Sequence, residues 1–106
     1  MAKTLSLSAV TATGTGTGFM WGIFPKANVT LTVVTSGSPT AGQVALQVSN
    51  GNGTTWTTVD TWVAGTDASG TPKSYHGSAV HAARANCTVA PSGGSSPTLS
   101  AYVVGI

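Results

Sequence analysis

One stretch of the chain, residues 43–59, constrains the fold more than any other. Its first half alternates valine and leucine with polar or small residues, which is the two-residue period of a β-strand with one buried face. Residues 50–53 read Asn-Gly-Asn-Gly, and these residue types accept the positive φ of tight hairpin turns. The β-branched and aromatic residues that follow, Trp56 among them, predict a returning strand. The stretch therefore predicts a β-hairpin with one solvent-exposed face and one buried face.

The strand pattern recurs along the rest of the chain, and no segment has the periodicity of a helix. Alternating apolar and polar residues occupy four further segments, which are 4–10, 28–35, 81–89 and 98–106. Residues 75–80 are ambiguous, and segments rich in Gly, Ser and Pro separate the others. About seven short strands with turns between them predict an all-β protein, an antiparallel β-sandwich that is Ig-like or jelly-roll-like. The residues expected in its core are Leu5, Leu7, Val29, Leu31, Val33, Val44, Leu46, Val48, Trp56, Val59, Leu99, Ala101 and Val103.

Charged side chains are scarce. They make up 6% of the 106 residues, against roughly 25% in an ordinary globular domain, whereas 41% of the chain is hydrophobic. A β protein with so few charges is poorly protected against association through its sheet edges. We therefore prefer a chain whose surface is covered in its working state over an ordinary uncharged monomer. The net charge of +2 comes from dispersed cations, which argues against nucleic acid as a partner.

The groups that could catalyse a reaction or bind a metal do not cluster in the sequence. Apart from hydroxyls they are His76, His81, Asp60, Asp67 and Cys87. No pair has a diagnostic metal-binding spacing, and zinc needs three or four converging ligands. Asp67 lies in an Ala/Ser/Gly loop, where aspartate is a common turn former, so a glycosidase pair with Asp60 is disfavoured. We expect no enzyme activity, no catalytic residues, no metal and no cofactor.

The compartment is indicated by what the sequence lacks. The single cysteine excludes an internal disulfide and is expected to be a small buried residue in a strand. The first residues alternate Leu and Ser instead of forming the apolar run of a secretory signal. No stretch approaches the ~18 apolar residues of a membrane helix. We therefore expect no membrane partner and synthesis in a cytoplasm.

Three sequence motifs resemble a known group of proteins. They are V-x-L-Q-x-S-x-G-x-G-x-T-W at residues 44–56, R-A-N at 84–86 and the closing A-Y-V-V-G at 101–105. Together they resemble the small β-sandwich virion proteins of tailed double-stranded DNA phages, which include head decoration proteins and Ig-like tail proteins. The resemblance spans about residues 26–106, and Asn52 stands where those sequences often have Asp. It describes a fold more specifically than a role.

The resemblance implies a structural protein that decorates or stabilises the outer surface of a phage capsid. Its partners would be the major capsid protein and sister subunits, in a homo-oligomer for which a trimer is one candidate. The protein would be made in the cytoplasm of the host bacterium and reside on the capsid exterior of the virion. The scarcity of charge fits this implication, because much of the surface would be shared with neighbours.

The first 24 residues are the least characteristic part of the chain. Residues 11–18 alternate Thr with Gly or Ala and form a low-complexity tether. Large apolar residues follow it within six positions, and these candidate interface residues are Phe19, Met20, Trp21, Ile23 and Phe24. Two interpretations remain open. Either residues 1–24 are a strand and arm that binds a neighbour, ahead of a sandwich domain at 25–106, or the apolar segment is a further core strand.

Two rival functions also remain open. A carbohydrate-binding adsorption module would bind surface glycans on exposed aromatic rings, for which Trp21, Trp62 and Tyr75 are the candidates, with Trp56 beside them. An Ig-like component of the tail tube or tail tip is the other rival. Two or more coplanar exposed aromatic rings would favour the glycan module, whereas a buried Trp56 and an extended N-terminal arm would favour binding to a shell.

Overall fold

Nine antiparallel strands and the turns between them make up the part of the chain that the structure describes. The structure is a computed structural model that describes residues 4–21, 26–49 and 54–106, and these ranges contain no helix. The strands are β1 (Thr4–Val10), β2 (Gly14–Thr15), β3 (Phe19–Met20), β4 (Lys26–Ser36), β5 (Ala41–Ser49), β6 (Thr57–Val63), β7 (Pro72–Val80), β8 (Ala82–Ser92) and β9 (Thr98–Gly105). The ambiguous segment 75–80 thus belongs to a strand.

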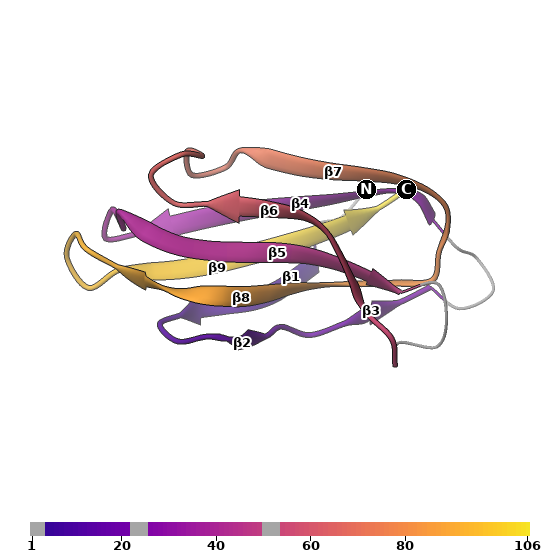
Figure 1. Cartoon of the computed structure of the whole chain (residues 1–106), viewed down its shortest axis with the longest axis horizontal. Helices are drawn as coiled ribbons and strands as arrows, with labels where there is room; N and C mark the ends of the chain where they lie inside the picture. Colours follow the sequence, from indigo (N-terminus) through magenta and orange to yellow (C-terminus); the bar gives the residue numbers. More distant parts are fainter. Residues whose placement is uncertain (1–3, 22–25, 50–53) are drawn as a thin grey trace.

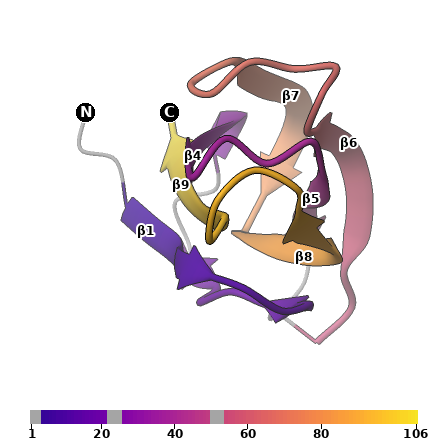
Figure 2. The same cartoon turned by 90° about the vertical axis from the view of Figure 1, so that its left-hand side faces the viewer.

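The strands form two sheets that face each other and run along the long axis of the molecule (Figure 1). The first sheet has the order β1-β9-β4-β7, and the second has the order β2-β8-β5-β6, with β3 also paired to β8. Figure 2 shows the two layers end-on, with the first sheet on one side and β8, β5 and β6 on the other. The prediction of an all-β antiparallel sandwich is confirmed.

The pairing of the strands identifies the sandwich as a jelly roll. β1 pairs with β9, β2 and β3 with β8, β4 with β7, and β5 with β6, so the first strand meets the last and the others nest inside. Two further pairings, β4 with β9 and β5 with β8, join these nested pairs into the two sheets. This is the double Greek-key connectivity of a jelly roll if β2 and β3 count as one interrupted strand.

The core lies between the sheets and is built by the alternation seen in the sequence. On β4 the residues Val29, Leu31 and Val33 are fully buried, and their polar neighbours face outward. Each buried valine or leucine contributes on the order of 1.5–3 kcal/mol through the hydrophobic effect. In the other sheet the buried residues of β8 are small, and they include Cys87, which is buried and free as expected. Small side chains in one layer leave room for large ones in the other.

The central hairpin is present, but its tryptophan lies elsewhere than expected. β5 and β6 pair antiparallel, and the turn predicted at residues 50–53 lies outside the described residues. β6 begins at Thr57, so Trp56 precedes the strand and is half-buried. Trp62 occupies the core in its place, with 1% of its surface exposed. Trp62 pairs with the buried Val44 of β5, so its ring points inward.

The N-terminal segment also differs from the expected arm, because it is paired into both sheets. β1 lies along β9, while β2 and β3 lie along β8. Leu7 is a core residue, although Leu5, which was also expected there, is 42% exposed. The hydroxyl of the buried Ser6 accepts a hydrogen bond from the N–H of Ala85 at 3.0 Å and donates one to the carbonyl of Thr17 at 2.8 Å.

Gly16 allows residues 11–18, the Thr/Gly segment, to pack closely against Ser6. The N–H of Gly16 donates to the carbonyl of Ala85 at 2.7 Å, and a Cβ at Gly16 would overlap the backbone of Ser6. The low-complexity composition therefore permits close packing between β1 and β8. The described strands β1, β2 and β3 thus belong to the two sheets, and residues 22–25, where the boundary between arm and sandwich was expected, lie outside the described residues.

Two loops interlock at the end of the sandwich that faces the viewer in Figure 2. They connect β4 to β5 and β8 to β9, and the N–H of Ser95 donates to the carbonyl of Gly37 at 2.9 Å. Gly94 has a φ of +60°, and a Cβ there would overlap the carbonyl oxygens of Gly37 and Ser38. Those atoms belong to the backbone, so no side-chain movement could relieve the overlap.

We expect Gly94→Ala to lower the free energy of unfolding by about 3 kcal/mol or more, because it combines left-handed backbone strain with a backbone clash. Gly70→Ala is the matched control, since Gly70 also has a positive φ of +87° but a Cβ there would meet nothing within 4 Å. Backbone strain alone should cost the control about 1–2 kcal/mol. Denaturant titrations of both variants measure the difference, and equal losses would show that the loops do not interlock.

Candidate functional surfaces

Of the five apolar residues proposed as an interface, the structure describes three, and two of these pack inside the sandwich. Phe19 and Trp21 are half-buried and pack against the core, whereas Met20 between them is 52% exposed. Ile23 and Phe24 lie outside the described residues. Pairing of β3 with β8 explains this placement, because neighbouring residues of a strand point to opposite faces. Of the three described candidates, Met20 alone offers a large exposed surface.

Trp21 is held where the N-terminal segment meets the last strand. Its N–H donates to the carbonyl of His81 at 2.7 Å. A Cβ at Gly105 would lie 2.6 Å from Cζ2 of the Trp21 ring, so the glycine provides the space that the ring occupies. The ring therefore helps to join the two sheets.

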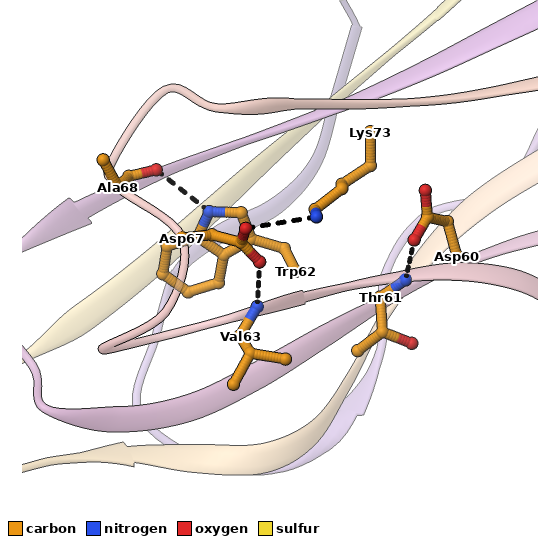
Figure 3. A network of polar contacts seen from close by, with 7 residues as sticks. All are labelled: Asp60, Thr61, Trp62, Val63, Asp67, Ala68 and Lys73. Atoms are coloured by element: carbon orange, nitrogen blue, oxygen red, sulfur yellow. Dashed lines mark hydrogen bonds and ion pairs between the residues drawn. The ribbon is translucent and has the colours of Figure 1, made fainter.

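The structure corrects the sugar-stacking role considered for Trp62. The ring is enclosed in the core, and its Nε1–H donates to the carbonyl of Ala68 at 3.1 Å (Figure 3). Tyr75 is half-buried against the core, and a Cβ at Gly77 would lie 2.6 Å from Cε2 of its ring. With Trp21 packed as described, none of the three candidates presents a fully exposed ring face.

Trp56 lies between a cation and a glycine. The guanidinium carbon of Arg84 is 4.3 Å from the ring centroid, and a Cβ at Gly18 would lie 3.3 Å from Cη2. Arg84 also donates through Nε to Oε1 of Gln47 at 2.8 Å, and Nε2 of that glutamine donates to the hydroxyl of Thr58 at 3.2 Å. The residues form a polar cluster on the outer face of the second sheet. It links the N-terminal segment to β8 and to the hairpin.

Asp67 organises the loop between β6 and β7 (Figure 3). Its Oδ2 accepts a hydrogen bond from the N–H of Val63 at 2.9 Å, and its Oδ1 lies 3.1 Å from Nζ of Lys73. The hydrogen bond to Val63 is the larger cause that lowers the pKa of Asp67, and Lys73 adds to it against the opposing effect of burial. The other carboxylate, on Asp60, accepts from the N–H of Thr61 at 2.8 Å.

The lowered pKa of Asp67 predicts a pH-dependent contribution to stability. A carboxylate with a lowered folded-state pKa stabilises the fold above its ordinary pKa of about 4, and this is lost as the pH falls through the lowered value. Asp67→Asn should remove that dependence. Lys73→Met should remove it only in part, since the hydrogen bond to Val63 remains.

NMR titration of the Asp67 carboxyl, with urea unfolding as a function of pH, tests both variants. A pKa of Asp67 that returns to its ordinary value in the Lys73→Met variant would assign the whole shift to the ion pair and contradict the ranking.

Other features of chemical interest are limited. Within the described ranges no three residues of the types His, Cys, Asp and Glu lie close enough to hold a metal ion. Burial raises the pKa of the Cys87 thiol, which keeps it protonated and unreactive at neutral pH. The same ranges contain no helix that is long and apolar enough to cross a membrane.

Sequence reasoning missed most of the exposed apolar surface. The large hydrophobic residues exposed in the described chain are Leu5, Met20, Val34, Val89 and Ile106. A signal was available for Val34, because it follows Val33 directly and therefore interrupts the alternation of its strand. No such signal marked Leu5, whose outward direction follows an irregularity in the register of β1.

Comparison with known proteins supports the fold. No protein-family model matches the chain, and a search of curated proteins also finds no match. The chain is similar in structure to SPBc2 prophage-derived protein YomS, known from a crystal structure, with a TM-score of 0.58 and 14% sequence identity. The alignment covers 96% of this chain and 90% of that chain. At this identity the two share a fold, and that fold occurs, over nearly its whole length, in a phage-derived protein.

Proposed function

We propose that this chain is a structural protein of a phage virion, which decorates and stabilises the outer surface of the capsid. The observation that carries the proposal is the likeness to a prophage-derived protein over almost the entire chain. Jelly rolls serve in viral capsids and in lectins, so the fold admits the role without requiring it. The partners in this proposal are the major capsid protein and sister subunits of a homo-oligomer.

The distribution of charge supports a surface made for repeated contacts. Lys73 and Asp67 are paired with each other, Arg84 lies over Trp56 and bonds Gln47, and Asp60 bonds the backbone. Four of the few charged side chains are thus engaged within the subunit, which leaves a surface of mostly Thr, Ser and Gly. A neutral surface of this kind avoids repulsion when many identical copies crowd on a shell.

The same contacts favour a role without catalysis or cofactor. Both carboxylates accept hydrogen bonds from the backbone of β6, where they fix the local conformation. The thiol of Cys87 is buried within the core cluster. We therefore assign the polar groups to structure and the function to binding.

The test uses virions of the phage that encodes the chain and shells that lack it. The purified protein should co-sediment with such shells at a fixed ratio per shell subunit. In intact virions, gold-labelled antibodies should mark the head. Labelling of the tail instead would favour a tail-tube or tail-tip component. Absence from virions, or binding to host glycans without binding to shells, would refute decoration.

A further inference from the structure

The outer face of the first sheet carries an apolar band whose members belong to adjacent strands. Residues that pair directly across strands project to the same face of a sheet. Leu5 of β1 pairs with Tyr102 of β9, which pairs in turn with Thr32 of β4. Val34 lies two positions along β4 from Thr32, and Val104 lies two positions along β9 from Tyr102. Because the strands are antiparallel, the two valines flank the Thr32–Tyr102 row on opposite sides and share its face. Leu5 and Val34 are 42% and 40% exposed.

None of the Lys, Arg, Asp and Glu side chains on the described strands of the first sheet belongs to this outer face. In the described residues of the first sheet the Lys, Arg, Asp and Glu side chains are Lys26 and Lys73 alone. They pair with Val80 and Leu31, which are fully buried, so both lysines belong to rows on the inner side. The outer face of the second sheet differs, because Arg84 lies on it.

The polar groups of this face can form hydrogen bonds with the same groups of a second copy. They are mainly hydroxyls, such as those of Thr30 and Ser74, which lie 3.0 Å apart. A hydroxyl both donates and accepts hydrogen bonds, whereas a carboxylate or an ammonium does only one of these at neutral pH. A two-fold interface places the same patch on both sides, so it requires self-complementary groups. A neutral face of hydroxyl and apolar residues meets this requirement.

The size of the face is sufficient for a specific contact. Four strands about 4.8 Å apart and about 8 residues long give a projected area of roughly 500 Å². The accessible surface of a pleated face exceeds its projection and so approaches the ~800 Å² per partner of a standard interface.

We propose that a second copy of this chain covers the outer face of the first sheet, with the two sheets packed face to face about a two-fold axis. Leu5, Val34, Tyr102 and Val104 form the apolar centre of the interface, and the hydroxyl residues around them bond across it. The interface supplies the subunit contact that the proposed virion role needs, and in that sense it deepens that role. Its test requires no shell, so its failure and the failure of shell binding are separate results.

Two variants place a charge in the proposed interface, and a matched variant places it elsewhere. Val34→Lys and Leu5→Lys put an ammonium on the face, where burial without a partner would oppose association. Val89→Lys is the control, because Val89 is exposed to 41% but belongs to β8 in the second sheet. Circular dichroism and thermal unfolding of each variant establish that the fold is retained.

Sedimentation equilibrium over a range of concentrations measures the mass. The wild-type protein and Val89→Lys should approach twice the chain mass of 10.4 kDa. Both face variants should raise the dissociation constant by about 100-fold or more. A monomeric wild-type protein, equal weakening by Val89→Lys, or a trimer would overturn the two-fold pairing. Loss of shell binding by Val34→Lys at unchanged mass would assign the face to the capsid instead.

Discussion

Deletion of residues 1–21 should abolish the cooperative unfolding transition of the protein. The deletion removes β1 from β9 and the β2–β3 segment from β8, so both sheets lose an edge strand. It also removes Leu7 from the core, and truncation of a buried leucine alone costs 2–5 kcal/mol. The sum exceeds about 5 kcal/mol, which is comparable to the whole stability of many small domains.

Chemical denaturation followed by circular dichroism measures this effect. Ser6→Ala provides a graded comparison, because it removes one hydroxyl and leaves the buried N–H of Ala85 without that acceptor. We expect it to cost about 1–3 kcal/mol while cooperativity is retained. A truncated chain that unfolds at the wild-type midpoint would contradict the paired arrangement and restore the interpretation of an independent arm.

Trp62→Ala should be among the most destabilising single substitutions in the chain, with a loss of about 3–5 kcal/mol. Trp62 is the largest fully buried side chain, and its removal would leave a large cavity between the sheets. The change also leaves the carbonyl of Ala68 without the hydrogen bond from the indole Nε1. That carbonyl belongs to the loop that Asp67 holds against β6, so the loop should loosen as well.

Trp56→Ala is the matched control, since the same side chain is removed from a half-buried position. It removes the contact with Arg84, and an exposed cation–π pair is worth about 0.5–1 kcal/mol. With the loss of packing against Gly18, we expect less than about 2 kcal/mol in total. Urea titrations give both free energies of unfolding. A larger loss from Trp56→Ala than from Trp62→Ala would reverse the assignment of the core tryptophan.

The sequence does not predict which of the two tryptophans, Trp56 or Trp62, is buried in the core. Both follow the same turn signal and each comes directly after a threonine, so local pattern does not distinguish the inward ring from the outward one. The register irregularity between β5 and β6, at Leu46 and Gln47, changes which residues of β6 face inward. An irregularity of this kind depends on pairing between strands and leaves little trace in the sequence of one strand.

The exposed surfaces likewise depend on strand pairing, which the sequence does not reveal. Aromatic residues at positions 19 and 21 suggested an interface, but their pairing with β8 uses them against the core. The band around Tyr102 was not expected, because it comes from β1, β4 and β9, which are far apart in the chain. A surface assembled from distant strands is visible only after their order in the sheet is known.

The sequence by itself determined the fold class, since the alternation in segments such as β4 and β9 fixes which side chains can be buried together. It also determined the scarcity of charge on which the proposed role depends. Tertiary structure alone decided the nesting of the strands and the incorporation of the Thr/Gly segment. Both depend on contacts between distant residues, such as Ser6 with Ala85, and their pairing energy has no local signal.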